Sequence, residues 1–341
     1  MENFNHISRK KETFPIKSNL LEYLEKYSRT NKLPIEYEDL LNYTQIIPSE
    51  TESEESNNLW NGVLYPPQYN EIITNGLIQL YQLLNANGES INHLYIGNIE
   101  FCNYGNSKPF RIKVINEIND NHDYFYVKKS DASRVYGLEL EHIFSPNKIN
   151  YLCSTKTLVE EHIIGIPGDL YIKKMKYIEN SEEVRLAKEF VKFNERCFVR
   201  LLGDMRAYNY VIVIQQDFDK INYRLRAMDF DQQSYEKRKN TYLPQFFKGN
   251  NYFVQLVSQK MTKKTILQYQ KEEKSLLKKR LLLAENKYNY LIKCMKTDTI
   301  SIKSHINQLK SELNSHHNCS DFNSANNMGE ILDINVRLCL E

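Results

Sequence analysis

The sequence predicts an α+β protein in which a β-rich part precedes a helix-rich part, with a helical extension at the N-terminus. Runs rich in Ile, Val, Tyr and Phe gather between residues 93 and 163, separated by polar turns, which is typical of strands. Apolar residues recur at helical spacing before residue 84 and again beyond residue 184. The chain has 341 residues, enough for one large or two ordinary domains.

Composition narrows the classes of function. The chain is 41% hydrophobic and 26% charged, which suits a globular protein. Its 45 basic and 43 acidic residues nearly cancel, so the overall charge does not favour a nucleic-acid partner. No apolar run approaches the roughly 18 residues of a membrane span. The first residues also lack the apolar core of a signal peptide. We therefore expect a cytoplasmic protein with no membrane partner.

The cysteines predict neither zinc nor disulfides. All six are widely spaced and none forms a CxxC pair. The nearest approach to a metal-binding cluster is His-His-Asn-Cys at residues 316–319. Because this run lies in a polar stretch rich in Asn and Ser, we predict a loop there.

The first 88 residues are expected to form the helical extension. Leucines at helical spacing occur over residues 18–45, and a second periodic run covers residues 69–84. Residues 49–58 are acidic and rich in serine, which indicates a loop or linker. The Asn-Ala-Asn-Gly run at residues 85–88 should end the second helix in a turn.

The β-rich part should cover residues 89–165. Its first three strands are predicted as an antiparallel meander over residues 93–101, 110–118 and 124–129. A helix is expected over 132–144, followed by strands over 151–153 and 157–163. The sequence Gly-Ile-Pro-Gly at 165–168 predicts a hard turn.

The helix-rich part should cover residues 166–320, with a C-terminal segment over 321–341. A long helix is predicted over 184–202, followed by strands over 210–215 and 223–228. Further helices are predicted over 262–296 and 302–315.

The two central strands of this part carry a group of polar residues. Asn209 follows Asp204 by five positions and directly precedes the first strand, and Asp229 directly follows the second. A hairpin brings the outer ends of its strands together, so these three residues should be neighbours. Carboxylate and amide oxygens are ligands that suit Mg²⁺. The sequence therefore predicts a magnesium site at this end of the hairpin.

A lysine for phosphate groups is expected on the third strand of the meander. Lys128 and Lys129 are adjacent there and must point to opposite faces of the sheet. We favour Lys128, because it lies in phase with Tyr126. The alternative is that both are solvated lysines of an edge strand.

These residues resemble the protein-kinase-like family over residues ~90–300. The Asp204–Asn209 segment resembles its catalytic loop, and Asp229-Phe230-Asp231 resembles its metal-binding element, with Asp231 replacing a glycine. Residues 124–129 resemble the lysine strand, and residues 157–170 resemble the hinge strand and the linker to the second lobe. The missing glycine and the longer hairpin are closer to atypical relatives such as the phosphoinositide kinases and the HipA-type kinases.

The resemblance implies a two-lobed fold that binds ATP and Mg²⁺ and transfers the γ-phosphate to a hydroxyl of an unidentified protein or small-molecule acceptor. It implies that Asp204 accepts the hydroxyl proton, that Asn209 and Asp229 hold the metal, and that Lys128 holds the α- and β-phosphates. Further nucleotide-binding residues would be Glu141, expected to pair with Lys128, and Glu160 and Glu161 of the hinge strand. Arg206 could touch a phosphate or pair with a surface carboxylate.

The chain departs from the family pattern in ways that leave two alternatives open. It has no G-x-G-x-x-G, Leu202-Gly203 stands where the family has His-Arg, and Glu141 follows Lys128 by only 13 positions. One alternative is a catalytically inactive kinase-like binding or scaffold protein. The other is an α+β interaction protein whose residues 260–293, with ten Lys/Arg against three Asp/Glu, bind an anionic surface. That basic run could equally be the solvated face of a helix.

Overall fold

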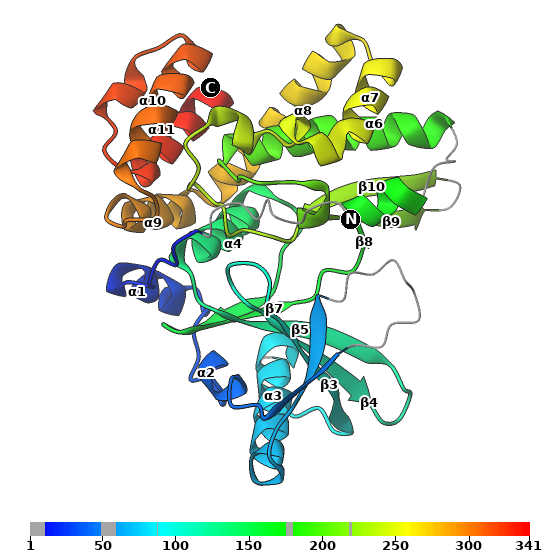
Figure 1. The fold of residues 1–341 in the computed structure, drawn as a ribbon. Helices are drawn as coiled ribbons and strands as arrows, with labels where there is room; N and C mark the ends of the chain where they lie inside the picture. Colours follow the sequence, from blue (N-terminus) through cyan, green and yellow to red (C-terminus); the bar gives the residue numbers. More distant parts are fainter. Residues whose placement is uncertain (1–10, 49–58, 87, 175–179, 218–219) are drawn as a thin grey trace. The chain divides into compact units, whose positions relative to one another are not determined.

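The computed structural model describes residues 11–48, 59–86, 88–174, 180–217 and 220–341. The chain divides into two compact units, which are treated separately below (Figure 1). The first comprises the described residues up to Ala132 together with Ile149–His162. The second comprises Ser133–Lys148 and Ile163–Glu341.

The first unit is built on an antiparallel sheet of seven strands in the order β1-β2-β3-β4-β5-β7-β6. The strands are β1 (Gln45–Pro48), β2 (Trp60–Leu64), β3 (Leu94–Cys102), β4 (Phe110–Asn116), β5 (His122–Lys129), β6 (Tyr151–Cys153) and β7 (Thr157–Glu161). The predicted meander is confirmed as β3, β4 and β5, and the two later strands are confirmed as β6 and β7.

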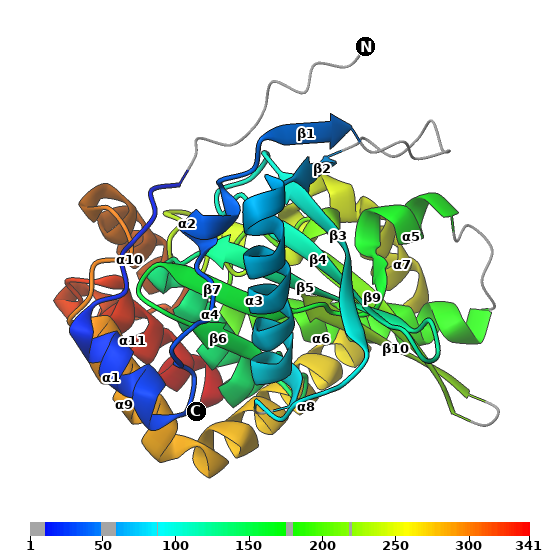
Figure 2. The same ribbon diagram turned by 90° about the horizontal axis from the view of Figure 1, so that it is seen from below.

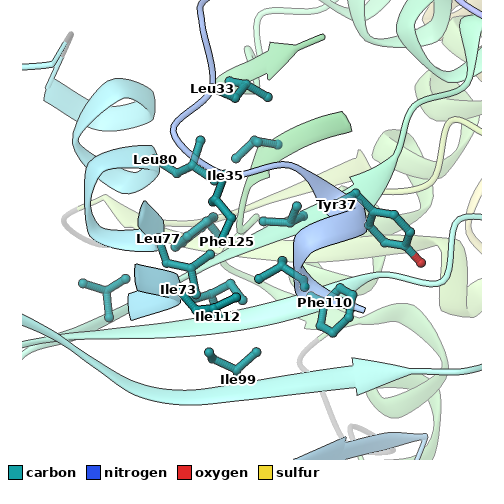
Figure 3. Packing of buried hydrophobic residues seen from close by; sticks show 14 of the residues in the cluster. Leu33, Ile35, Tyr37, Ile73, Leu77, Leu80, Ile99, Phe110, Ile112 and Phe125 are labelled. Atoms are coloured by element: carbon teal, nitrogen blue, oxygen red, sulfur yellow. The ribbon is translucent and has the colours of Figure 1, made fainter. Parts of the chain in front are cut away.

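One face of this sheet carries the apolar core of the unit. The helix α3 (Pro67–Ala86), which was predicted, covers this face (Figure 2). Its buried residues Ile73, Leu77 and Leu80 pack with strand residues such as Ile112 and Phe125 (Figure 3). Burial of each such side chain contributes about 1.5–3 kcal/mol. Because strand side chains alternate, the opposite face is left to the polar residues described below.

The N-terminal region differs from the expected helical extension. It holds two short helices, α1 (Ser18–Lys26) and α2 (Tyr37–Leu40), and then turns into β1 and β2. These two strands pair with each other, and β2 pairs with β3, so the region adds an edge to the sheet. The predicted helical run over 18–45 is confirmed at α1 and at the short α2, and it is wrong between and after them. The predicted linker at 49–58 lies outside the described residues.

The second unit combines a small sheet with many helices. Its sheet has the order β10-β9-β8, formed by β8 (Ile166–Pro167), β9 (Tyr210–Asp217) and β10 (Lys220–Ala227). The α-helices are α4 (Ala132–Phe144), α5 (Gly168–Lys174), α6 (Asn180–Val199), α7 (Asn251–Lys260), α8 (Lys263–Leu283), α9 (Glu285–Lys296), α10 (Lys303–His317) and α11 (Met328–Leu340). The helix α6 packs on β10 and also on α7 and α8. No helix in the described ranges is long and apolar enough to cross a membrane.

Two sequence predictions for this unit are corrected. The turn expected at 165–168 is instead the short strand β8, and Gly168 begins α5. The prediction of a loop over residues 316–319 is wrong for the first two residues, because His316 and His317 lie in the last turn of α10. The ring of His316 packs edge-on against Phe198 at 5.0 Å, and this contact outweighs the polar composition. Asn318, with a left-handed backbone, ends the helix.

Gly168 should not tolerate a side chain. A Cβ at this position would lie 2.6 Å from the carbonyl oxygen of Ala207 and 2.5 Å from the ring of Tyr210. We expect Gly168→Ala to lower the free energy of unfolding by about 1–3 kcal/mol, measured by urea denaturation. Gly249→Ala is the matched control, since its Cβ would lie 3.7 Å from the same Ala207. Equal stability of the two variants would contradict this packing.

Candidate functional site

The segment that leads to Asp204 leaves α6 through a Schellman motif. The backbone N–H of Leu202 donates to Cys197 O at 2.9 Å, and that of Leu201 donates to Phe198 O at 3.2 Å. Leu201 takes the left-handed position, with φ at 51°, where glycine is usual. Its side chain is fully buried, and this burial offsets the backbone strain.

Asp204 is held in place by its backbone. Its φ is 57°, and its N–H donates to Thr241 O at 3.1 Å. The N–H of the preceding Gly203 donates to Gln232 O at 3.2 Å, and a Cβ on Gly203 would lie only 3.0 Å from that oxygen. The loop therefore follows the segment after β10 closely.

The carboxylate of Asp204 is partly buried and accepts two side-chain donors of its own loop. Arg206 Nε donates to Oδ1 at 2.7 Å. Asn209 Nδ2 donates to the backbone oxygen of Asp204 at 2.7 Å and lies 3.5 Å from Oδ2. Burial raises the pKa of Asp204, although Arg206 and Asn209 act to lower it. A carboxylate with a raised pKa is suited to accept a proton.

The hairpin of β9 and β10 brings Asn209 and Asp229 to the same end. Tyr210 pairs with Ala227 in the register, and the N–H of Met228 donates to Asn209 O at 3.0 Å. The hydroxyl of Tyr208 senses both carboxylates. Burial raises its pKa, the charge of Arg206 lowers the pKa, and the charges of Asp204 and Asp229 raise it further. The three predicted residues thus form one group in the second unit.

Arg134 of α4 is a member of this group that sequence reasoning missed. Its Nη1 donates to Asp229 Oδ1 and to Asp231 Oδ1, each at 2.9 Å, and its Nη2 donates to Met228 O at 3.2 Å. Its side chain is only 2% exposed. The available signal was Asp231: a second carboxylate in place of a glycine needs a nearby cation when buried.

The helix α4 is fixed to the segment around Phe230 by close contacts. Ser133 Oγ donates to Gln233 O at 2.7 Å. A Cβ on Gly137 would lie 2.9 Å from Cβ of Phe230, so only glycine lets the helix approach this closely. These contacts place Arg134 beside Asp229.

Glu141, on the same helix, has a different partner from the one expected. Its carboxylate accepts a hydrogen bond from Arg200 Nη1, and both side chains are almost fully buried. Burial lowers the pKa of Arg200 to about 9, which leaves it protonated at neutral pH. The predicted pair of Glu141 with Lys128 is therefore corrected: a buried arginine of the second unit already neutralises this carboxylate.

Lys128 belongs to the polar face of the sheet in the first unit. Its Nζ lies 2.6 Å from Glu160 Oε2, and both side chains are buried. The Nζ also lies 5.2 Å from the ring centre of Tyr126, in phase with it as expected, while Lys129 is exposed. Glu160 is thus the partner of Lys128, and Glu161 lies at the partly exposed end of β7.

The register extends this face across the sheet as a row of charged and polar side chains. Glu100, Arg111, Tyr126 and Glu160 stand directly opposite one another on β3, β4, β5 and β7. Arg111 Nε donates to Glu100 at 2.6 Å, and its guanidinium lies 4.6 Å from the ring centre of Trp60. Ionic and aromatic groups therefore share one surface with Lys128.

Arg206 is engaged by Asp204, and its guanidinium lies 5.6 Å from the ring centre of Phe247. Within the described ranges, no three or more His, Cys, Asp or Glu side chains are grouped to hold a metal ion. A cation at Asp229 would therefore need Asn209 and the oxygens of a bound ligand as well.

Neither the models of known protein families nor the curated proteins contain a match to this chain.

Proposed function

We propose that this chain is an atypical kinase-like phosphotransferase that moves the γ-phosphate of ATP to a hydroxyl acceptor. One observation carries the proposal: Asp204, Asn209 and Asp229 lie at one end of the β9–β10 hairpin. Asn209 bonds to Asp204 through its side chain and to Met228, the residue before Asp229, through its backbone oxygen. Two carboxylates and an amide in this order along the chain are what Mg²⁺-dependent phosphoryl transfer uses.

Each residue has a role that its contacts allow. Asp229 and Asn209 offer oxygen atoms to Mg²⁺, which supplies charge neutralisation to the phosphates when bound. Asp204, with its raised pKa, accepts the proton of the acceptor hydroxyl. Lys128, oriented by Glu160, offers its ammonium group to the α- and β-phosphates. Catalysis would then rest on positioning and on charge.

A second candidate, a catalytically inactive binding protein of the same class, is favoured by Arg134 and Arg206. These side chains donate to Asp229 and Asp204, so the protein supplies its own cations to both carboxylates. In such a protein the nucleotide would bind without turnover and without a requirement for Mg²⁺.

The fluorescence of Trp60 separates the candidates, because it is the sole tryptophan of the chain. Its ring centre lies 6.0 Å from that of Tyr126, which in turn contacts Lys128. We expect ATP to change the Trp60 signal with saturation only when Mg²⁺ is present, and we expect ADP to appear over time. Lys129→Met serves as the control, since this lysine points to the other face, and it should bind as the wild type does.

The other two results of this titration would contradict the proposed phosphotransferase. A saturable change that needs no Mg²⁺ and yields no ADP would favour the inactive protein. A flat signal, with no effect of ATP on the melting temperature, would exclude a nucleotide site and with it both candidates.

A further inference from the structure

The segment after Asp231 forms, with α10, an open cavity of about 600 Å³ in the second unit. The segment contributes Arg238, Lys239 and Asn240, and α10 contributes Ser311, Glu312, Ser315 and His316. Apart from Glu312, these residues offer hydrogen-bond donors, which is the composition of an anion site rather than of an apolar pocket.

The basic side of this cavity is a short loop that is fixed at both ends. The hydroxyl of the buried Tyr242 donates to Glu236 O at 2.6 Å, which closes the loop. Before it, Tyr235 O accepts hydrogen bonds from Ser301 Oγ at 2.6 Å and from His305 Nδ1 at 2.8 Å. The positive side chains are thus carried by a preorganised backbone, which reduces the entropy lost when a ligand binds.

The two cationic side chains of the cavity, Arg238 and Lys239, are not engaged in ion pairs within the described ranges. In the part of the chain that the structure describes, their side chains form no ion pair or hydrogen bond, and it is the backbone N–H of Lys239 that donates to Glu312. The environment is positive as well: burial lowers the pKa of His316 to about 4, and the charges of Lys239 and Lys274 add to this effect. His316 therefore lines the cavity as a neutral imidazole and adds no negative charge to it.

Two features oppose an anion. The carboxylate of Glu312 lines the cavity, although its oxygens already accept hydrogen bonds from the Lys239 N–H at 2.7 Å and from Gln308 at 2.9 Å. The C-terminal end of α10 is also present, and its dipole disfavours negative charge. Arg238 and Lys239 must therefore carry the affinity between them, which makes the site testable.

We propose that this cavity binds a phosphate monoester, with Arg238 and Lys239 on its oxygens and Ser311, Ser315 and Asn240 as further donors. A guanidinium fork beside an ammonium group is suited to a compact dianion. The proposal does not depend on ATP or Mg²⁺. It does extend the candidate site, because Thr241, next to this loop, accepts the N–H of Asp204.

The test measures the binding of O-phospho-L-serine and of inorganic phosphate to the full-length protein. Binding is detected as broadening of the ³¹P resonance of each probe when the protein is added. We expect at least one of the two to be broadened. The Arg238→Gln, Lys239→Gln double variant should weaken that binding by about tenfold or more. If only phosphoserine binds, the phosphate is read on an amino acid; if both bind, the cavity reads the phosphate alone.

Lys237→Gln is the matched control, because it removes the same charge from the same exposed loop but does not line the cavity. It should leave the binding of the phosphate probe unchanged. Arg238→Gln alone and Lys239→Gln alone give the comparison at equal charge. If Lys237→Gln weakens binding as much as either of these, the effect is diffuse surface charge and the proposal fails. No broadening of either probe would also overturn it. Arg238→Lys, which keeps the charge, should retain part of the affinity, and thermal unfolding of each variant checks that the fold is intact.

Discussion

Replacement of Arg134 by alanine is expected to lower the free energy of unfolding by about 3–5 kcal/mol. The guanidinium is 2% exposed and bonds to Asp229 and Asp231 through one nitrogen. Its removal takes a shared donor from two adjacent carboxylates, and the loss is costly at Asp231 because that side chain is buried. Denaturation in urea, with the midpoint and slope both measured, gives this quantity.

Arg337→Ala provides the comparison. Arg337 also bridges two carboxylates, of Asp321 and Glu341, but its side chain is 52% exposed. Water screens such pairs, so its loss should change the stability by no more than about 1 kcal/mol. Arg134→Lys keeps a charge at the site and should recover part of the loss. If Arg134→Ala were as stable as Arg337→Ala, the buried bridge would have no structural importance.

The largest expected effect on function comes from the two aspartates of the hairpin end. Asp204→Asn keeps the shape of the side chain but removes its basicity, so the rate of phosphoryl transfer should fall by about 10²–10⁴-fold while Mg-ATP still binds. Asp229→Asn should instead weaken Mg-ATP binding itself, because the proposed metal would lose a charged ligand. The Trp60 titration measures binding, and ADP release measures turnover.

Asp217→Asn is the control for both variants. Asp217 lies on the same hairpin, but it is exposed at the opposite end, where it pairs in the register with Lys220. This variant should bind and turn over ATP as the wild type does. Full activity of both Asp204→Asn and Asp229→Asn would refute the assignment of the site.

Local patterns were sufficient for much of the fold. The 3.6-residue period of α3 and the alternating strands β3 to β5 could be predicted, because each depends on which face of a short segment is apolar. The pairing of β1 and β2 could not, since an edge strand of four or five residues is stabilised by a partner distant in sequence. At His316 and His317, composition predicts a loop, whereas packing against Phe198 places both residues in α10.

For the candidate site, the sequence by itself determined that Asp204, Asn209 and Asp229 are neighbours, because a hairpin joins its outer ends whatever surrounds it. It also determined that Lys128 shares a face with Tyr126, because strand side chains alternate. Only the tertiary structure decided the charge partners: Glu160 for Lys128, Arg200 for Glu141, and Arg134 for Asp229. Such pairs depend on which elements pack together and how deeply they are buried, and neither is encoded in local spacing.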